Sequence, residues 1–73
     1  MKDYHINVFW SDEDRCYIAD IPDLKHCSAR GETAESAVRE VTVAKNLWIE
    51  AAREVGKPVP RPRYKPLIYQ LGR

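Results

Sequence analysis

The sequence predicts an α+β fold of two layers, in the order β-β-β-α-β, as a single domain over residues 1–73. Three observations support this prediction. The first is a long apolar stripe with helical spacing between Thr33 and Gly56, and the second is a pair of alternating apolar segments before it. The third is the length of 73 residues, which leaves room for one domain whose helix and sheet must bury their apolar faces against each other.

The apolar stripe predicts a helix that begins after Thr33 and ends before Gly56. The Thr33 hydroxyl can accept a hydrogen bond from an unpaired backbone N–H of the first turn, and Gly56 followed by Pro58 supplies a stop. One face of this helix is expected to be buried, with Trp48 as a core anchor. The apolar residues recur at intervals of three and four, at Ala34, Ala37, Val38, Val41, Ala44, Trp48, Ala51, Ala52 and Val55.

Two segments with a period of two predict a β-hairpin. The first strand covers residues 4–10, with its apolar face formed by every second residue, and the second strand covers residues 16–21. Residues 11–14 between them are polar and are expected to form a solvated hairpin tip. The three carboxylates of this tip do not indicate an EF-hand, because that calcium loop needs a longer ligand register with a central glycine.

A third strand is predicted at residues 24–30. Pro22-Asp23 should end the second strand, because proline cannot donate to a sheet ladder and aspartate bonds readily to the following backbone. The chain then returns as the last strand of an antiparallel meander that leads into the helix. The apolar face of the meander is expected to meet the helix stripe in a core of Tyr4 or Ile6, Val8, Ile18, Val38, Val41 and Trp48.

Charge is divided unevenly along the chain. Residues 1–56 hold 7 Lys or Arg and 11 Asp or Glu, a net charge of −4, whereas residues 57–73 hold 5 and none, a net charge of +5. Residues 57–66 are predicted to be a basic, proline-rich linker, and the β-prone residues 67–71 a fourth strand beside the first. The basic tail either lies back on the acidic body or serves as an interaction tail.

Few residues could act as metal ligands or nucleophiles. The histidines and cysteines lack the paired short spacing of a structural zinc site, so no metal or other cofactor is expected. A turn centred near Asp23 would place Cys16 opposite Arg30 and away from Cys27, which argues against a disulfide. Neither a Ser-His-Asp arrangement nor a phosphate-binding glycine loop is present, and we expect no enzymatic activity.

A set of short motifs resembles the HicB-like antitoxin family over about residues 4–62. The resemblance implies a partial ribonuclease H fold and a protein partner, the small RNA-cleaving toxin HicA, which has a double-stranded-RNA-binding-like fold. Without an acidic residue facing out of the first strand, ribonuclease H chemistry has no evident metal centre here. In chain order the motifs are Tyr17, Pro22-Asp23-Leu24, Cys27, Gly31-Glu32-Thr33, Glu35, Ala37, Leu47-Trp48-Ile49 and Gly56-Lys57-Pro58-Val59-Pro60.

The chain departs from the family pattern at three places. Arg15-Cys16 stands where a glycine-rich tip is common, and Lys25-His26 stands where the family often has Pro-Gly. Many members continue into a helix-turn-helix or ribbon-helix-helix domain that binds their own operator. Only 13 residues follow Pro60, so no DNA-reading module is expected here.

Two functions are compatible with these observations. The resemblance favours an antitoxin-type interaction module that masks a HicA-like toxin, with an acidic body that suits a basic partner. The alternative is a nucleic-acid-binding domain that uses Arg61, Arg63, Tyr64 and Lys65. In either case we expect a homodimer or higher oligomer, because a domain of this size leaves apolar surface uncovered.

Composition also suggests where the protein works. No apolar run approaches the roughly 18 residues that span a bilayer, and the N-terminus lacks a secretory signal, so we expect a cytoplasmic protein. The scarcity of Asn and Gln beside abundant Arg, Glu, Ile and Val suggests a heat-tolerant source.

Overall fold

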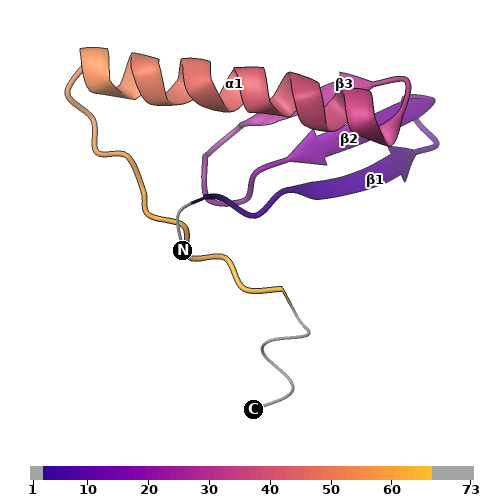
Figure 1. The fold of residues 1–73 in the computed structure, drawn as a ribbon, viewed down its shortest axis with the longest axis horizontal. Helices are drawn as coiled ribbons and strands as arrows, with labels where there is room; N and C mark the ends of the chain where they lie inside the picture. The colour runs from indigo at the N-terminus through magenta and orange to yellow at the C-terminus, as the bar shows by residue number, and fades with distance from the viewer. Residues whose placement is uncertain (1–2, 67–73) are drawn as a thin grey trace.

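A three-stranded sheet and one long helix form the two layers of the fold (Figure 1), in a computed structural model that describes residues 3–66. The strands are β1 (Asn7–Ser11), β2 (Cys16–Asp20) and β3 (Ser28–Gly31), and the helix is α1 (Ala34–Glu54). The strands pair antiparallel in the order β1-β2-β3. The predicted α+β meander followed by one helix is confirmed, whereas the fourth strand predicted at 67–71 lies outside the described residues.

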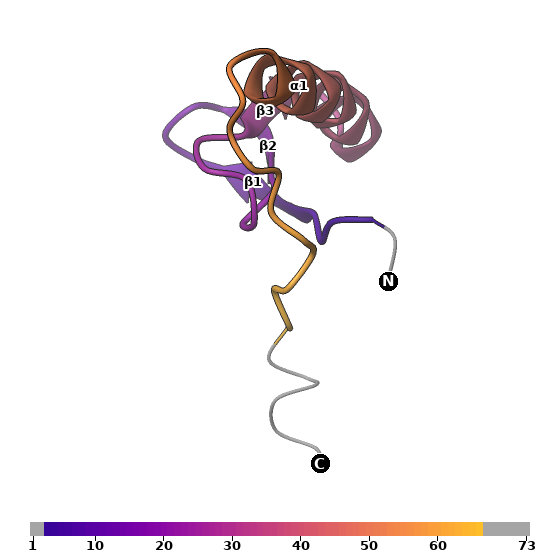
Figure 2. The ribbon, with the colours of Figure 1, turned by 90° about the vertical axis from the view of Figure 1, so that its left-hand side faces the viewer.

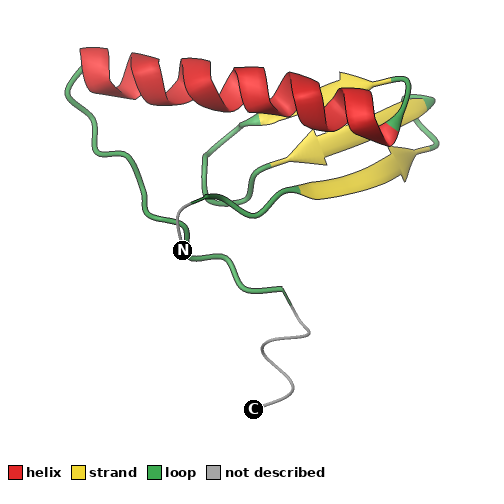
Figure 3. Ribbon diagram, in the orientation of Figure 1, coloured by secondary structure: helices red, strands yellow, loops and turns green. Residues whose placement is uncertain are grey.

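The helix α1 crosses one face of the sheet and leaves the other face open (Figures 1 and 2). It lies mainly over β3 and β2 and contacts β1 least. Residues 57–66 then run as a loop without helix or strand away from the end of α1 and past the start of the chain (Figure 3). We call these residues the docked tail, because they are held on the body by the contacts described below.

Local signals at both ends of α1 explain where the helix begins and ends. The Ser36 backbone N–H donates to Thr33 Oγ1, and the Thr33 N–H donates to Ser36 Oγ, each over 3.0 Å. These reciprocal bonds satisfy two backbone donors of the kind left unpaired at a helix start. At the other end Gly56 has φ +76°, and the Lys57 N–H donates to the Ala52 carbonyl over 2.8 Å. The predicted start at Thr33 and stop at Gly56 are both confirmed.

The core lies between α1 and the centre of the sheet. Tyr4, Ile6 and Trp48 pack against it while remaining partly exposed. The predicted burial of Val41 is confirmed, since this side chain is fully enclosed. The buried residues of this core are Ala19, Ile21, Leu24, Cys27, Ala37 and Val41.

Three residues predicted for the core lie elsewhere. Val38 is partly exposed on α1 and does not pack against the buried cluster. Val8 pairs with Ala19 and so shares the helix-facing side of the sheet, but α1 lies over β3 and β2, which leaves Val8 39% exposed at the edge. Ile18 pairs with Phe9 and Arg30, on the side that faces away from α1. Because neighbouring residues of a strand point to opposite faces, the burial of Ala19 fixes Ile18 on the open face.

The predicted third strand at 24–30 is shorter than expected and starts at Ser28. Residues 22–27 instead form a loop that is closed by three backbone hydrogen bonds: the Ile21 N–H to the Cys27 carbonyl over 3.0 Å, Leu24 to Ile21 over 3.1 Å, and Cys27 to Leu24 over 3.1 Å. The loop thereby directs Leu24 and Cys27 into the core, where their burial favours this turn over an extended strand.

Candidate interaction surface

The described residues hold no cluster suited to metal chemistry. No three His, Cys, Asp or Glu side chains within residues 3–66 gather closely enough to hold an ion. Cys16 and Cys27 are both free thiols. Burial raises the pKa of the Cys27 thiol, with Lys45 acting weakly in the opposite direction, so this cysteine behaves as a small apolar core residue. The residues that can contact another molecule lie instead on the open face of the sheet and on the docked tail.

The open sheet face has an apolar centre. Phe9, Ile18 and Arg30 occur in register on β1, β2 and β3, and together they define what we call the open sheet face. Phe9 is 49% exposed, so its ring contributes apolar area to this face. A shallow depression of about 430 Å³ lies over this face and extends to Glu13 and Asp14 of the hairpin tip.

Carboxylates of the hairpin tip border this apolar centre. Asp14 lies 3.6 Å from the Arg30 guanidinium, and Ser11 Oγ accepts a hydrogen bond from the Asp14 N–H over 3.1 Å. Asp12 accepts from Trp10 Nε1 over 2.9 Å, on the helix-facing side of β1. The predicted solvated tip is therefore ordered by its own side chains. Its acidic residues are exposed, so they give this end of the sheet a negative potential.

The docked tail is held by long-range hydrogen bonds. A single oxygen of the Asp23 carboxylate accepts from the backbone N–H groups of Arg63 over 2.9 Å and Tyr64 over 3.1 Å. The Tyr4 hydroxyl donates to the Pro60 carbonyl, and the rings of His5 and Tyr64 lie 4.6 Å apart. The donors of Arg63 first, and of Tyr64 second, hold the pKa of the Asp23 carboxyl below its ordinary value.

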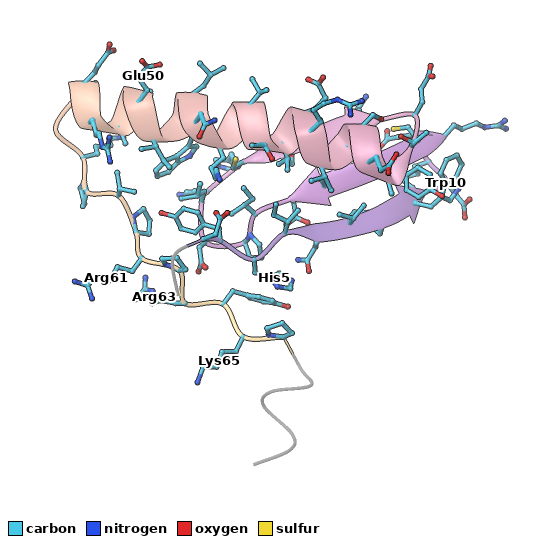
Figure 4. The ribbon with its side chains drawn as sticks, in the orientation of Figure 1. His5, Trp10, Glu50, Arg61, Arg63 and Lys65 are labelled. Carbon is cyan, nitrogen blue, oxygen red and sulfur yellow. The ribbon has the colours of Figure 1, made fainter. Side chains whose placement is uncertain are left out.

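The basic residues predicted for nucleic-acid contact are brought together on this tail. Figure 4 shows Arg61, Arg63 and Lys65 along one edge of the docked tail, with His5 on the opposite side. All three basic residues are exposed. Tyr64, which the sequence suggested as a stacking residue for a base, packs its ring against His5 and remains 43% exposed.

Comparison with known proteins identifies the family. The model of the HicB-like antitoxin of bacterial toxin–antitoxin systems matches residues 4–68. The chain belongs to the HicB-like antitoxin family. This family is non-enzymatic. No solved structure gave a significant match.

Two relatives come from Synechocystis sp. (strain ATCC 27184 / PCC 6803 / Kazusa). The UPF0150 protein ssl0259 is 39% identical over 44 residues, which are 60% of this chain and 60% of that protein. The UPF0150 protein ssr1765 is 37% identical over 59 residues, which are 80% of this chain and 75% of that protein. The chain therefore matches less than two thirds of the first relative's length.

Several residues of the HicB-like motifs lie where the backbone or the core requires them. A Cβ added to Gly31 would lie 2.8 Å from Ala37 Cα and closer still to Ser36 Oγ, so the last residue of β3 must lack a side chain. Ala37 itself is fully buried at this contact. Thr33 caps α1, as described above, and its exposed side chain is used for that bond.

Most of the remaining motif residues lie in or beside the loop at 22–27, whereas Tyr17 lies at the other end of β2. Trp48 Nε1 donates to the Lys25 carbonyl over 2.9 Å, Leu24 and Cys27 are buried, and Pro22 is exposed. Tyr17 makes an edge-to-face contact with Trp10, with ring centroids 5.2 Å apart.

Both positions where the chain departs from the glycines common in the family have left-handed backbone. Arg15 has φ +56° and His26 has φ +63°. Both turns therefore have the left-handed conformation that glycine adopts most easily, although neither has a glycine at that position.

Sequence reasoning did not find the role of Asp23 in fixing the tail or the exposure of Phe9. Asp23 and Arg63 are 40 positions apart, and their contact depends on the path of the whole chain. The alternation of strand one did contain the signal for Phe9, because an aromatic residue on the face opposite Val8 and Trp10 must lie away from the helix.

Proposed function

We propose that this HicB-like chain is an antitoxin that binds and masks a small RNA-cleaving toxin of the HicA type. The observation that supports the proposal is the family match over residues 4–68, which includes every strand and the helix of the described fold. Such an antitoxin would act in the cytoplasm, where the toxin meets its RNA. Within residues 3–66 no helix combines the length and apolar character that crossing a bilayer requires.

The open sheet face is our proposed contact surface for the toxin. A protein that grips RNA must present cations to the phosphates, so its RNA-binding surface is basic. The acidic hairpin tip beside the exposed Phe9 offers the opposite charge around an apolar centre. Masking then follows directly, because a face that covers the toxin's basic surface excludes the RNA from it.

Charge and apolar contact should act on different steps of binding. Glu13 and Asp14 should raise the rate of encounter with a basic partner, an effect that salt screens. Phe9 and Ile18 should determine how long the complex lasts, because most affinity differences at an interface arise in the dissociation rate.

Co-expression with a candidate HicA-like toxin tests the proposal. We expect the chain to relieve the toxin's growth arrest and to copurify with it as a complex. No complex and no relief of the arrest would overturn the proposed function.

Two matched pairs of variants test the surface. Phe9→Ser should shorten the lifetime of the complex, whereas Val55→Ser should not, since Val55 is 69% exposed at the end of α1 and away from the sheet. Charge reversal at Glu13 and Asp14 should slow association, whereas the same reversal at the exposed Glu50 and Glu54 of α1 should not. A complex that tolerates Phe9→Ser as well as Val55→Ser would leave the antitoxin function intact and exclude the open sheet face as its site.

A further inference from the structure

The docked tail is fixed before any ligand arrives. Its backbone is held at Pro60 by the Tyr4 hydroxyl and at Arg63 and Tyr64 by one Asp23 oxygen. A loose tail would have to be ordered on binding, and each ordered residue lowers the affinity. A tail that is already ordered presents its side chains at little further cost in entropy.

The fixed backbone places positive charge at regular steps. Arg61, Arg63 and Lys65 occupy every second position of this segment. Pro62 and Pro66, on the alternate positions, are half-buried, whereas the three basic residues are exposed. Figure 4 shows the three side chains on that one edge. The edge therefore forms a row of cations, which we call the basic edge.

The charged side chains of the docked tail all have the same sign. Residues 57–66 contain four Lys or Arg and no Asp or Glu. Trp10, beside the acidic hairpin tip, lies at the far end of the molecule from Arg61 and Lys65 (Figure 4). Asp23 accepts hydrogen bonds from two backbone N–H groups of the tail and also attracts the Arg63 cation. The positive potential of the basic edge is thus separated from the acidic hairpin tip.

We propose that the basic edge of the docked tail binds the sugar–phosphate backbone of single-stranded nucleic acid, with Asp23 as the residue that positions it. A polymer with a phosphate at every step matches cations repeated along an extended chain. The ring of Tyr64, 43% exposed, packs against His5, which lies on the side of the docked tail opposite to the basic edge, and it offers a surface on which a base can stack. An acidic peptide would match the charge but would not use the rings. This site is separate from the open sheet face and does not depend on the toxin.

Fluorescence anisotropy on the whole chain tests this site. The probes are a labelled oligouridylate of about 12 nucleotides, within the range of known single-strand site sizes, and its DNA counterpart. Binding should weaken with salt, and the double variant Arg61→Ala/Arg63→Ala should lower the slope of log K against log salt by about 1.4, since each single-strand phosphate contact contributes about 0.7. The matched control Arg39→Ala/Arg53→Ala removes the same charge from exposed positions of α1 and should leave the slope unchanged.

Three outcomes would overturn the proposal. They are absence of binding at low salt, an equal loss of slope in both double variants, and tighter binding of a labelled polyglutamate than of either oligonucleotide. Comparison of the RNA and DNA probes shows whether the 2′-hydroxyl adds to the shared phosphate recognition, and tighter binding of either probe supports the site.

A second pair of variants tests the positioning role of Asp23. Asp23→Asn and Asp23→Ala remove the same negative charge, but the asparagine retains an oxygen that can accept from Arg63 and Tyr64. Asp23→Ala should therefore bind the oligonucleotide about fivefold more weakly than Asp23→Asn, the factor expected for ordering about one residue. Equal affinities would show that the tail needs no fixed backbone and would overturn that part of the proposal.

Discussion

Arg15 and His26 hold left-handed backbone in two turns on which the fold depends. Their φ values of +56° and +63° cost a residue with a side chain about 1–2 kcal/mol relative to the right-handed region. Arg15 closes the hairpin with its N–H donated to the Ser11 carbonyl over 2.8 Å, and His26 belongs to the loop that buries Leu24. The chain therefore accepts local strain to keep these turns.

Glycine at either position should relieve this strain. We predict that Arg15→Gly and His26→Gly each stabilise the fold by about 0.5–1 kcal/mol, the strain relieved less the extra entropy of glycine in the unfolded chain. Arg39→Gly, within the helix, should instead destabilise by about 1 kcal/mol. Urea denaturation measures all three. If Arg15→Gly and His26→Gly destabilise the fold as much as Arg39→Gly does, the backbone at Arg15 and His26 is not strained.

Gly31 is needed for a different reason: the packing of α1 leaves no space for a side chain there. We predict that Gly31→Ala destabilises by about 3 kcal/mol, because its Cβ would lie 2.8 Å from Ala37 Cα and α1 would have to move off β3. Gly56→Ala is the control: its Cβ would meet no atom within 4 Å, and only the positive φ would cost about 1 kcal/mol. If thermal melts show that Gly56→Ala lowers the melting temperature more than Gly31→Ala does, the space requirement at Gly31 is contradicted.

The Asp23 carboxylate makes tail docking dependent on pH. Its pKa in the folded chain is lowered below the ordinary 3.8 by the N–H donors of Arg63 and Tyr64, so protonation is disfavoured while the tail is docked. The contribution of this contact is complete above pH 3.8 and is lost as the pH falls through the lowered folded pKa. We therefore predict that acidification releases the tail.

Nuclear magnetic resonance can follow this release. The amide signals of Arg63 and Tyr64 should move together below pH 3.8, whereas in Asp23→Asn they should show no such titration. Amide signals that stay constant down to acid unfolding would mean that the carboxylate does not hold the tail.

At the scale of elements, α1 and the loop at 22–27 stabilise each other through Trp48. The indole packs on the core and donates its N–H to the Lys25 carbonyl over 2.9 Å. Tryptophan is therefore suited to this position, because it covers apolar surface and also satisfies a loop carbonyl. The same helix begins at a cap in which Ser36 replaces the more usual Glu or Gln at the third position, since its hydroxyl reaches the Thr33 N–H.

Two substitutions of Trp48 separate the apolar packing of the ring from its hydrogen bond to the Lys25 carbonyl. We predict that Trp48→Ala destabilises by about 3 kcal/mol, the lower end of the range for large aromatics because the ring is partly exposed. Trp48→Phe should cost only about 1 kcal/mol, through loss of the hydrogen bond to Lys25. The free energy of unfolding in denaturant measures both. If Trp48→Ala has the same free energy of unfolding as the parent chain, the loop and the helix do not stabilise each other through this ring.

At the scale of the whole molecule, apolar surface remains on several sides of the fold. Val43 and Leu47, one turn apart on α1, are 52% and 60% exposed, and Val8, Phe9 and Trp10 are exposed on β1. A chain of 8.5 kDa buries a limited share of its surface, so association with a second copy would cover what the fold leaves open.

We predict a homodimer that covers Val43 and Leu47. Sedimentation equilibrium at micromolar concentration should give twice the chain mass of 8.5 kDa, and Leu47→Ser should shift the equilibrium towards the monomer. An 8.5 kDa species alone in the parent chain would rule out the dimer. Glu13→Ser, at the exposed hairpin tip and away from this face of α1, serves as the control and should leave the mass unchanged.

The sequence by itself determined the features that depend on nearby residues. The cap at Thr33, the stop at Gly56 and the alternation of the first two strands are local signals, so the helix and the hairpin were predictable. The motif order was sufficient to predict the HicB-like family, which the match over residues 4–68 confirms.

The tertiary structure decided which faces are buried and where the tail lies. Both faces of β1 and β2 carry apolar residues, so alternation alone could not choose between Ala19 and Ile18 for the core. The face on which α1 packs made that choice, and the lateral position of α1 over β3 and β2 left Val8 at the edge. The tail likewise depends on Asp23 meeting Arg63 across 40 positions. These contacts join segments distant in sequence, and their free energy exists only after the helix has packed on the sheet.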